Sequence, residues 1–129
     1  CPLEQHRHDN IVQRALSLAG SLRIGFIADG IHVPYFALKN YLAVAGIENA
    51  FIVTDAVAAA GNGPGKYKLA GHDVVVDENL ATWAADGSHL VGAATPMNRA
   101  VENLRKHLQI SEAEIRRLTS ENPARILGL

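Results

Sequence analysis

Two aspartates, each directly after a short apolar run, are the residues of this sequence best placed for chemistry. Residues 24–29 read IGFIAD and end on Asp29, and residues 50–55 read AFIVTD and end on Asp55. His32 lies three residues after Asp29. An apolar strand that ends on a carboxylate near a histidine can hold a general base in a pocket with little water. The spacing therefore predicts proton-transfer chemistry near these three side chains.

Each of these residues also has a purely structural interpretation. Asp29 could cap the helix expected to begin near Pro34, because aspartate is a common N-cap. Asp55 suits capping less well, since the sequence after it, AVAAAGNGPG, is a poor helix former. A single histidine beside an apolar strand is more often structural than functional. Spacing alone thus indicates a candidate active-site face and leaves the structural interpretations open.

Two further polar stretches are weaker candidates. His6 and His8 have the spacing of paired metal ligands, but no apolar strand precedes them to present both rings, so a solvated or anion-binding loop with Arg7 as its phosphate contact is favoured. Residues 61–66, GNGPGK, lack the Ser or Thr that follows the lysine of a phosphate-binding P-loop. We interpret them as a turn.

The elements that must position Asp29 and Asp55 follow from hydrophobic spacing. A buried strand, a helix that starts at Pro34 and stops at Gly46, and a second buried strand occupy about 30 residues, the length of a βαβ unit. The chemistry of parallel α/β folds lies at the carboxyl ends of the strands, where both aspartates fall. Other predicted elements are helices over 10–19, 96–108 and 111–120, a last turn from 122, and two or three short antiparallel strands within 61–92. Ser111 and Glu114 predict a capping box at the start of the 111–120 helix.

Composition limits the possible partners. Lysine and arginine total 12 against 13 aspartates and glutamates, which argues against nucleic acid or an anionic membrane. The chain has one cysteine, so no disulfide can form within it and a reducing, cytoplasmic setting is expected.

Four segments of the sequence together resemble a known enzyme family. They are FIADGIHVP (26–34), FIVTDAVAAAGNGPGKYKLAG (51–71), HLVGAATPMNRAVENL (89–104) and ENPARILGL (121–129). In this order and spacing they resemble the C-terminal third of N-acetylglucosamine-6-phosphate deacetylases, metal-dependent enzymes of the amidohydrolase superfamily. The resemblance implies an α/β fold: late βα units of a (β/α)8 TIM-type barrel with an inserted short antiparallel β-hairpin region.

The resemblance also implies roles for individual residues. Asp55 would be the general acid/base that removes the acetyl group from N-acetylglucosamine 6-phosphate, giving glucosamine 6-phosphate and acetate. The divalent metal, zinc or iron, would have all its ligands outside this chain. The implied substrate-binding residues are Arg7 at the phosphate, the loop of Asp29, Gly30, Ile31 and His32, and the pocket-lining Leu90, Val91 and Gly92. Val91 replaces the family's usual serine, and the next small polar position is Ala93, so another N-acetylated amino sugar is an open alternative.

The length of the chain conflicts with a complete enzyme. A barrel of this type needs roughly 250 residues, and the chain has 129. We therefore expect residues 1–129 to be the C-terminal portion of an amidohydrolase barrel, a fragment that is inactive alone. The resemblance implies that the complete enzyme is a homodimer. The alternative is a non-catalytic, truncated α/β module that binds a sugar phosphate or a partner chain.

Overall fold

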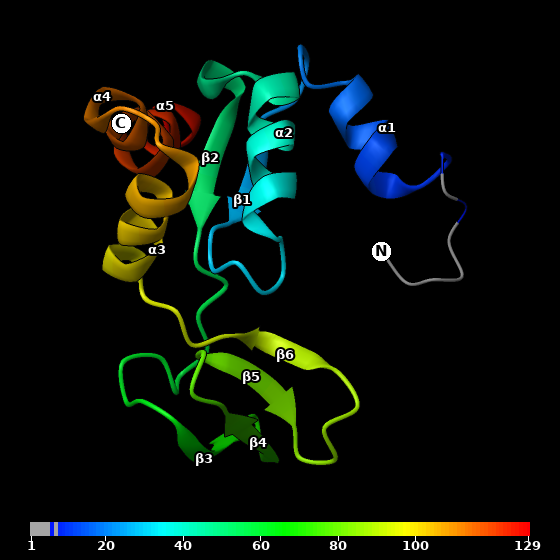
Figure 1. The fold of residues 1–129 in the computed structure, drawn as a ribbon, viewed down its shortest axis with the longest axis vertical. Helices are drawn as coiled ribbons and strands as arrows, with labels where there is room; N and C mark the ends of the chain where they lie inside the picture. Colours follow the sequence, from blue (N-terminus) through cyan, green and yellow to red (C-terminus); the bar gives the residue numbers. More distant parts are fainter. Residues whose placement is uncertain (1–5, 7) are drawn as a thin grey trace.

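The computed structural model describes residue 6 and residues 8–129 (Figure 1). Its elements form a parallel pair of strands, a group of helices and a separate antiparallel sheet. In chain order they are α1 (Ile11–Ser17), β1 (Ile24–Ile27), α2 (Tyr35–Ala45), β2 (Ala50–Val53), β3 (Gly65–Leu69), β4 (His72–Val76), β5 (Ala81–Ala84), β6 (Leu90–Ala93), α3 (Met97–Asn103), α4 (Glu112–Arg116) and α5 (Asn122–Leu127). A 3-10 turn (Ile47–Asn49) precedes β2, and π-helical turns follow α3 (Leu104–Leu108) and α4 (Arg117–Glu121).

The predicted βαβ unit is confirmed. β1 and β2 pair in parallel, with Ile24 opposite Ala50 and Ile27 opposite Val53, and α2 connects them. α2 begins directly after Pro34, whose φ of -55° suits a helix start, and ends before Gly46, whose φ is 77°. Its buried face, which includes Leu38 and Leu42, packs in the main hydrophobic core with the strands.

The glycine-rich middle of the chain folds into a four-stranded antiparallel sheet in the order β3-β4-β5-β6. The prediction of two or three strands missed β6, which pairs with β5 across a register shift between Ala81 and Trp83. Ala93 at the end of β6 also forms a parallel bridge with Ala56, just beyond β2. The antiparallel sheet is therefore tied to the carboxyl end of the parallel pair, below which it lies in Figure 1.

The C-terminal helices complete the core on the β2 side of the parallel pair (Figure 1). Leu104 and Leu118 are fully buried there. The predicted capping box is confirmed, because the Ser111 side chain accepts from the Glu114 N–H and the Glu114 carboxylate accepts from the Ser111 N–H. The buried Asn122 donates to the carbonyl oxygens of Ile47 and Ala50, at 2.7 Å each, and so joins α5 to the start of β2.

The α/β class and the antiparallel insertion agree with the prediction. Within the described residues the parallel sheet has two strands, so the complete TIM-type barrel stays a prediction. None of the helices in this part of the chain is long and apolar enough to cross a membrane.

Candidate active site

The turn after β1 is organised by the side chain of Asp29, which is completely shielded from solvent. Oδ1 accepts hydrogen bonds from the backbone N–H groups of Ile31 (2.9 Å) and His32 (3.0 Å). Oδ2 lies 2.6 Å from Nδ1 of His32. Asp29 therefore caps its own turn, whereas α2 starts six residues later with no side-chain cap. The interpretation of Asp29 as the N-cap of that helix is wrong.

The backbone of this turn is fixed from its far side. Gly30 has φ +79°, and a Cβ there would lie 2.5 Å from the ring of Tyr35, so a glycine is required. The Tyr35 hydroxyl donates to the Asp29 carbonyl (3.1 Å), and Asn103 Nδ2 donates to the Ala28 carbonyl (3.0 Å).

The Tyr35 ring stacks on His107 with centroids 4.0 Å apart. Burial, with a smaller contribution from the Asp29 charge, raises the pKa of Tyr35, and Arg99 opposes this rise.

Asp55 follows the neighbouring strand β2, at the position that corresponds to Asp29 after β1. The register pairs Ile27 with Val53, and the two aspartates each follow two residues later. Asp55 is exposed and has φ 50°, in the left-handed region that costs a non-glycine residue about 1–2 kcal/mol. Among the described residues its carboxylate has no hydrogen-bond or ion-pair partner, whereas its backbone carbonyl accepts from the Ala93 N–H at 2.9 Å. The fold thus holds the backbone of Asp55 and leaves its carboxylate available.

Strand β6 brings a second predicted segment against Asp55. Leu90 and Val91 are half-buried, and Gly92 has φ +72°. A Cβ on Gly92 would lie 2.6 Å from Cγ1 of Val57, 3.1 Å from the Asp55 carbonyl oxygen and 3.8 Å from Oδ2 of Asp55. The predicted pocket residues 90–92 therefore lie beside the predicted acid/base, Asp55.

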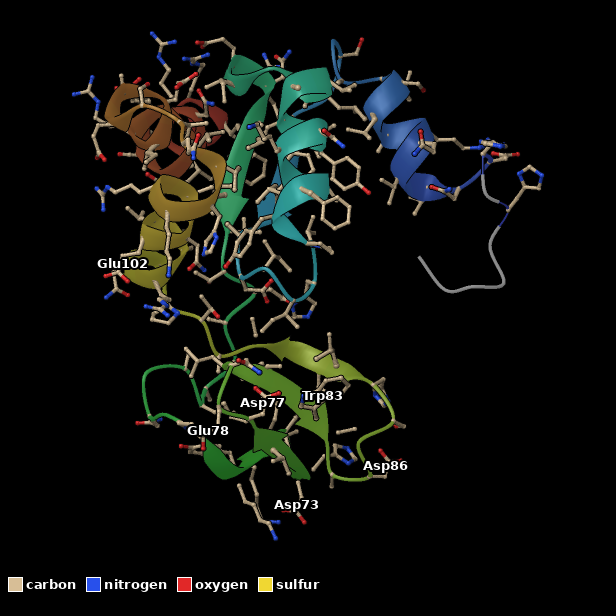
Figure 2. All side chains as sticks on the ribbon, viewed as in Figure 1. Asp73, Asp77, Glu78, Trp83, Asp86 and Glu102 are labelled. Carbon is tan, nitrogen blue, oxygen red and sulfur yellow. The ribbon has the colours of Figure 1, made fainter. Side chains whose placement is uncertain are left out.

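A cleft of about 680 Å³ lies between the turn after β1, α3 and the β4–β5 turn. Asp29, Gly30 and Ile31 line it, whereas His32, Asp55 and residues 90–92 do not. Figure 2 shows three residues of its sheet side, Asp77, Glu78 and Trp83. The structure therefore groups the predicted residues in two sets, one around Asp29 and one around Asp55 and Gly92.

Asp77 holds the β4–β5 turn in the way that Asp29 holds its own. Its Oδ1 accepts from the N–H groups of Asn79 (2.8 Å) and Ala81 (3.0 Å), and its Oδ2 accepts from Nε1 of Trp83 (3.0 Å). Burial alone would raise the pKa of Asp77, but these three donors together lower it below its ordinary value. Asp77 is therefore a structural carboxylate at the edge of the cleft.

Sequence reasoning missed Tyr35 and Asn103. The signal for Asn103 was a polar residue on the apolar face of the 96–108 helix, which indicates a specific buried hydrogen bond. The partner of that bond, Ala28, lies 75 residues away, and nothing local to either residue identifies it.

Arg7, the predicted phosphate contact, lies outside the described residues. Beside it, Nδ1 of His6 accepts from the N–H groups of His8 (3.2 Å) and Asp9 (3.1 Å), so one ring nitrogen is already occupied. No group of three or more His, Cys, Asp or Glu side chains among the described residues is arranged to hold a metal ion. The residues that the structure describes therefore do not offer a ligand set for a metal ion.

A parallel strand–helix–strand unit with its polar candidates at the carboxyl ends of the strands is the arrangement of α/β enzymes. No protein-family model matches the chain. Its sequence is nevertheless 32% identical to N-acetylglucosamine-6-phosphate deacetylase of Bacillus subtilis over 124 residues, which are 96% of this chain and 31% of that protein. It is 34% identical to N-acetylgalactosamine-6-phosphate deacetylase of Escherichia coli over 103 residues, 80% of this chain and 26% of that protein.

The fold leads to the same family. The crystal structure of N-acetylglucosamine-6-phosphate deacetylase from Thermotoga maritima matches with a TM-score of 0.84 and 30% identity, over 99% of this chain and 34% of that one. The chain is thus related to the N-acetylglucosamine-6-phosphate deacetylases, as its four segments predicted, and spans about a third of their length.

Proposed function

We propose that this chain forms one wall of the active site of a hydrolase that removes the acetyl group from N-acetylglucosamine 6-phosphate. The products are glucosamine 6-phosphate and acetate. The observation that carries the proposal is the placement of Asp55, whose carboxylate is exposed and unpaired among the described residues at the carboxyl end of β2. The relatives at 32% and 30% identity, both named as deacetylases of this sugar phosphate, supply the reaction.

Asp55 is proposed to move the proton that the reaction requires. Hydrolysis of an acetamide needs a base to accept a proton from the attacking water and an acid to protonate the departing amine. One carboxylate can do both in turn. The bond between the Asp55 carbonyl and the Ala93 N–H, at 2.9 Å, holds the backbone from which this carboxylate extends.

The remaining candidate residues are proposed to bind the sugar. His32 presents one ring nitrogen from the turn after β1, and Gly92 lets the backbone of β6 come close to Asp55. Arg7 is the proposed contact of the phosphate. A divalent metal would supply Lewis-acid activation of the water. Since the described residues do not offer a ligand set for it, the proposed steps of this chain do not pass through the metal.

The galactosamine relative supports a second candidate substrate. Its 34% identity is close to the 32% of the glucosamine enzyme, so N-acetylgalactosamine 6-phosphate is the alternative. The two sugars differ in the orientation of one hydroxyl group, and Leu90 and Val91, predicted to line the pocket, have apolar side chains that cannot accept a hydrogen bond from it.

The test is acetate release by the full-length enzyme that contains this chain, called the intact protein below, supplied with a divalent metal, from both sugar phosphates and from unphosphorylated N-acetylglucosamine. We expect turnover of the glucosamine phosphate with kcat/KM at least tenfold above that of the other two. A higher kcat/KM for the galactosamine phosphate would replace the substrate and keep the reaction. No acetate release from any of the three would remove the proposal and leave a non-catalytic binding module.

A further inference from the structure

We propose that Asp29 is a positioning residue for His32: it fixes the tautomer and orientation of the ring so that Nε2 is the nitrogen presented to the ligand. This inference rests on the proposed function only for the identity of that ligand. The geometry behind it lies wholly within residues 28–35 and Asn103.

The first argument concerns which ring nitrogen carries a hydrogen. Nδ1 of His32 lies 2.6 Å from Oδ2 of Asp29, a hydrogen-bond distance. A carboxylate accepts at both oxygens, so Nδ1 must be the donor. Nε2 then carries a lone pair in the neutral ring and a hydrogen in the charged ring, and it is free of protein partners among the described residues. The side chain of His32 is 20% exposed, so a ligand can reach that nitrogen.

The second argument concerns rigidity. The Asp29 side chain is 0% exposed and accepts from two backbone N–H groups in addition to the ring, so three hydrogen bonds restrict its rotation. Its own backbone is held by the hydroxyl of Tyr35, and the preceding carbonyl by Asn103. The imidazole is thus anchored through Asp29 to α2 and α3 instead of to a free loop.

The third argument is that, among the described residues, the Asp29 carboxylate bonds to its own turn and to the imidazole of His32 alone. Asp29 does not cap α2, makes no ion pair with a lysine or arginine among the residues that the structure describes, and lies beyond the last residue of β1. Burying a carboxylate away from water costs free energy, and here the hydrogen bonds to the turn and to the imidazole offset that cost. A second-layer carboxylate that orients a histidine is a common device of active sites.

The test begins with the tautomer of His32 in the wild-type protein. Nitrogen-15 NMR of the intact protein at a pH above 8, where an ordinary imidazole is neutral, distinguishes a hydrogen on Nδ1 from one on Nε2. We expect Nδ1–H for His32. A wild-type ring with its hydrogen on Nε2 would overturn the proposal without any variant.

Asp29→Asn is the decisive variant. The amide can still accept the two backbone bonds through Oδ1, but its NH₂ group now faces Nδ1 of His32, so the ring must move its hydrogen to Nε2 or lose the bond. We expect the His32 signals to change tautomer or broaden, and the Kd for N-acetylglucosamine 6-phosphate to rise about tenfold, the loss of roughly one hydrogen bond.

Asp77→Asn is the matched control. Asp77 also accepts two backbone N–H groups and one ring N–H, from Trp83, so the same chemical change weakens a turn of the same kind elsewhere. It should leave the His32 tautomer unchanged. Equal effects of the two variants on His32 would mean general destabilisation and would overturn the positioning role.

The two proposals fail separately in this experiment. A tautomer change in Asp29→Asn in a protein that releases no acetate from any sugar phosphate would support positioning and remove the proposed function. An unchanged tautomer and Kd in Asp29→Asn, in a protein that does release acetate, would remove positioning and keep the function.

Discussion

Replacing Gly92 by alanine perturbs the contact between β6 and Asp55 with a single methyl group. Gly92 has φ +72°, and the new Cβ would lie 2.6 Å from Cγ1 of Val57 and 3.1 Å from the carbonyl oxygen of Asp55. Real Cβ atoms do not approach other atoms so closely, so the substitution must displace Val57 or the Asp55 backbone. Its effect should therefore appear both in stability and in the placement of the proposed proton-transfer group.

Two effects lower the free energy of unfolding of Gly92→Ala. A left-handed backbone costs alanine about 1–2 kcal/mol. Overpacking against Val57 and the Asp55 carbonyl adds about 1–3 kcal/mol. Gly87 offers the matched control, because its φ of +71° is nearly the same and a Cβ there would meet nothing within 4 Å. Gly92→Ala should thus destabilise the protein by about 1–3 kcal/mol more than Gly87→Ala.

The assay is urea unfolding of both variants, compared through their midpoints at a common slope. The double substitution Gly92→Ala with Val57→Ala removes the 2.6 Å contact and should recover part of the difference. Acetate release should fall in Gly92→Ala and not in Gly87→Ala. Equal destabilisation by Gly92→Ala and Gly87→Ala would refute the reasoning, because it would mean that the close packing of Gly92 on Val57 adds nothing to the loss of stability.

Two further predictions concern polar side chains that bond to the backbone. Because its three donors hold the pKa of Asp77 below the unfolded value, Asp77 contributes stability that is present above the unfolded pKa and lost as the pH falls through the folded pKa. The difference in unfolding free energy between wild type and Asp77→Asn, measured at several pH values, should therefore shrink in acid. A difference that stays constant with pH would contradict this. Asn122→Ala leaves the carbonyls of Ile47 and Ala50 without their donor and should lower the free energy of unfolding in urea by about 2–3 kcal/mol. The exposed Asn98→Ala should lower it by less than about 0.5 kcal/mol. Similar values for both variants would contradict the prediction.

Local signals were enough for the βαβ unit and the helix ends. Continuous apolar runs are typical of strands covered on both faces, and Pro34 and Gly46 restrict α2 through backbone geometry alone. The capping box of Ser111 and Glu114 is likewise a contact between residues three apart. Each of these predictions depends on residues close together in the chain, which is why the sequence was sufficient.

Long-range pairing explains what the sequence did not reveal. β6 has only four residues, one of them Gly92, and it becomes a strand because Ala93 pairs both with Ala81 in β5 and with Ala56 beyond β2. The role of Asp29 depended on the direction of the turn at Gly30, since a chain that entered α2 directly would have made it a helix cap. The roles of Asp55 and His32 stay predictions until they are tested.

The measurement that tests the central claim most directly is turnover of N-acetylglucosamine 6-phosphate by the Asp55→Asn variant of the intact protein, with Asp86→Asn as the control. Asparagine keeps the size of the side chain and tolerates the left-handed backbone at φ 50°, but it cannot accept and return a proton. Asp86 is exposed, and within the described part of the chain its carboxylate bonds to Ser88 in its own turn. The account predicts that Asp55→Asn lowers kcat by at least 100-fold, of the order that general acid–base catalysis contributes, with unchanged metal content, while Asp86→Asn retains full activity. Wild-type turnover in Asp55→Asn would contradict it.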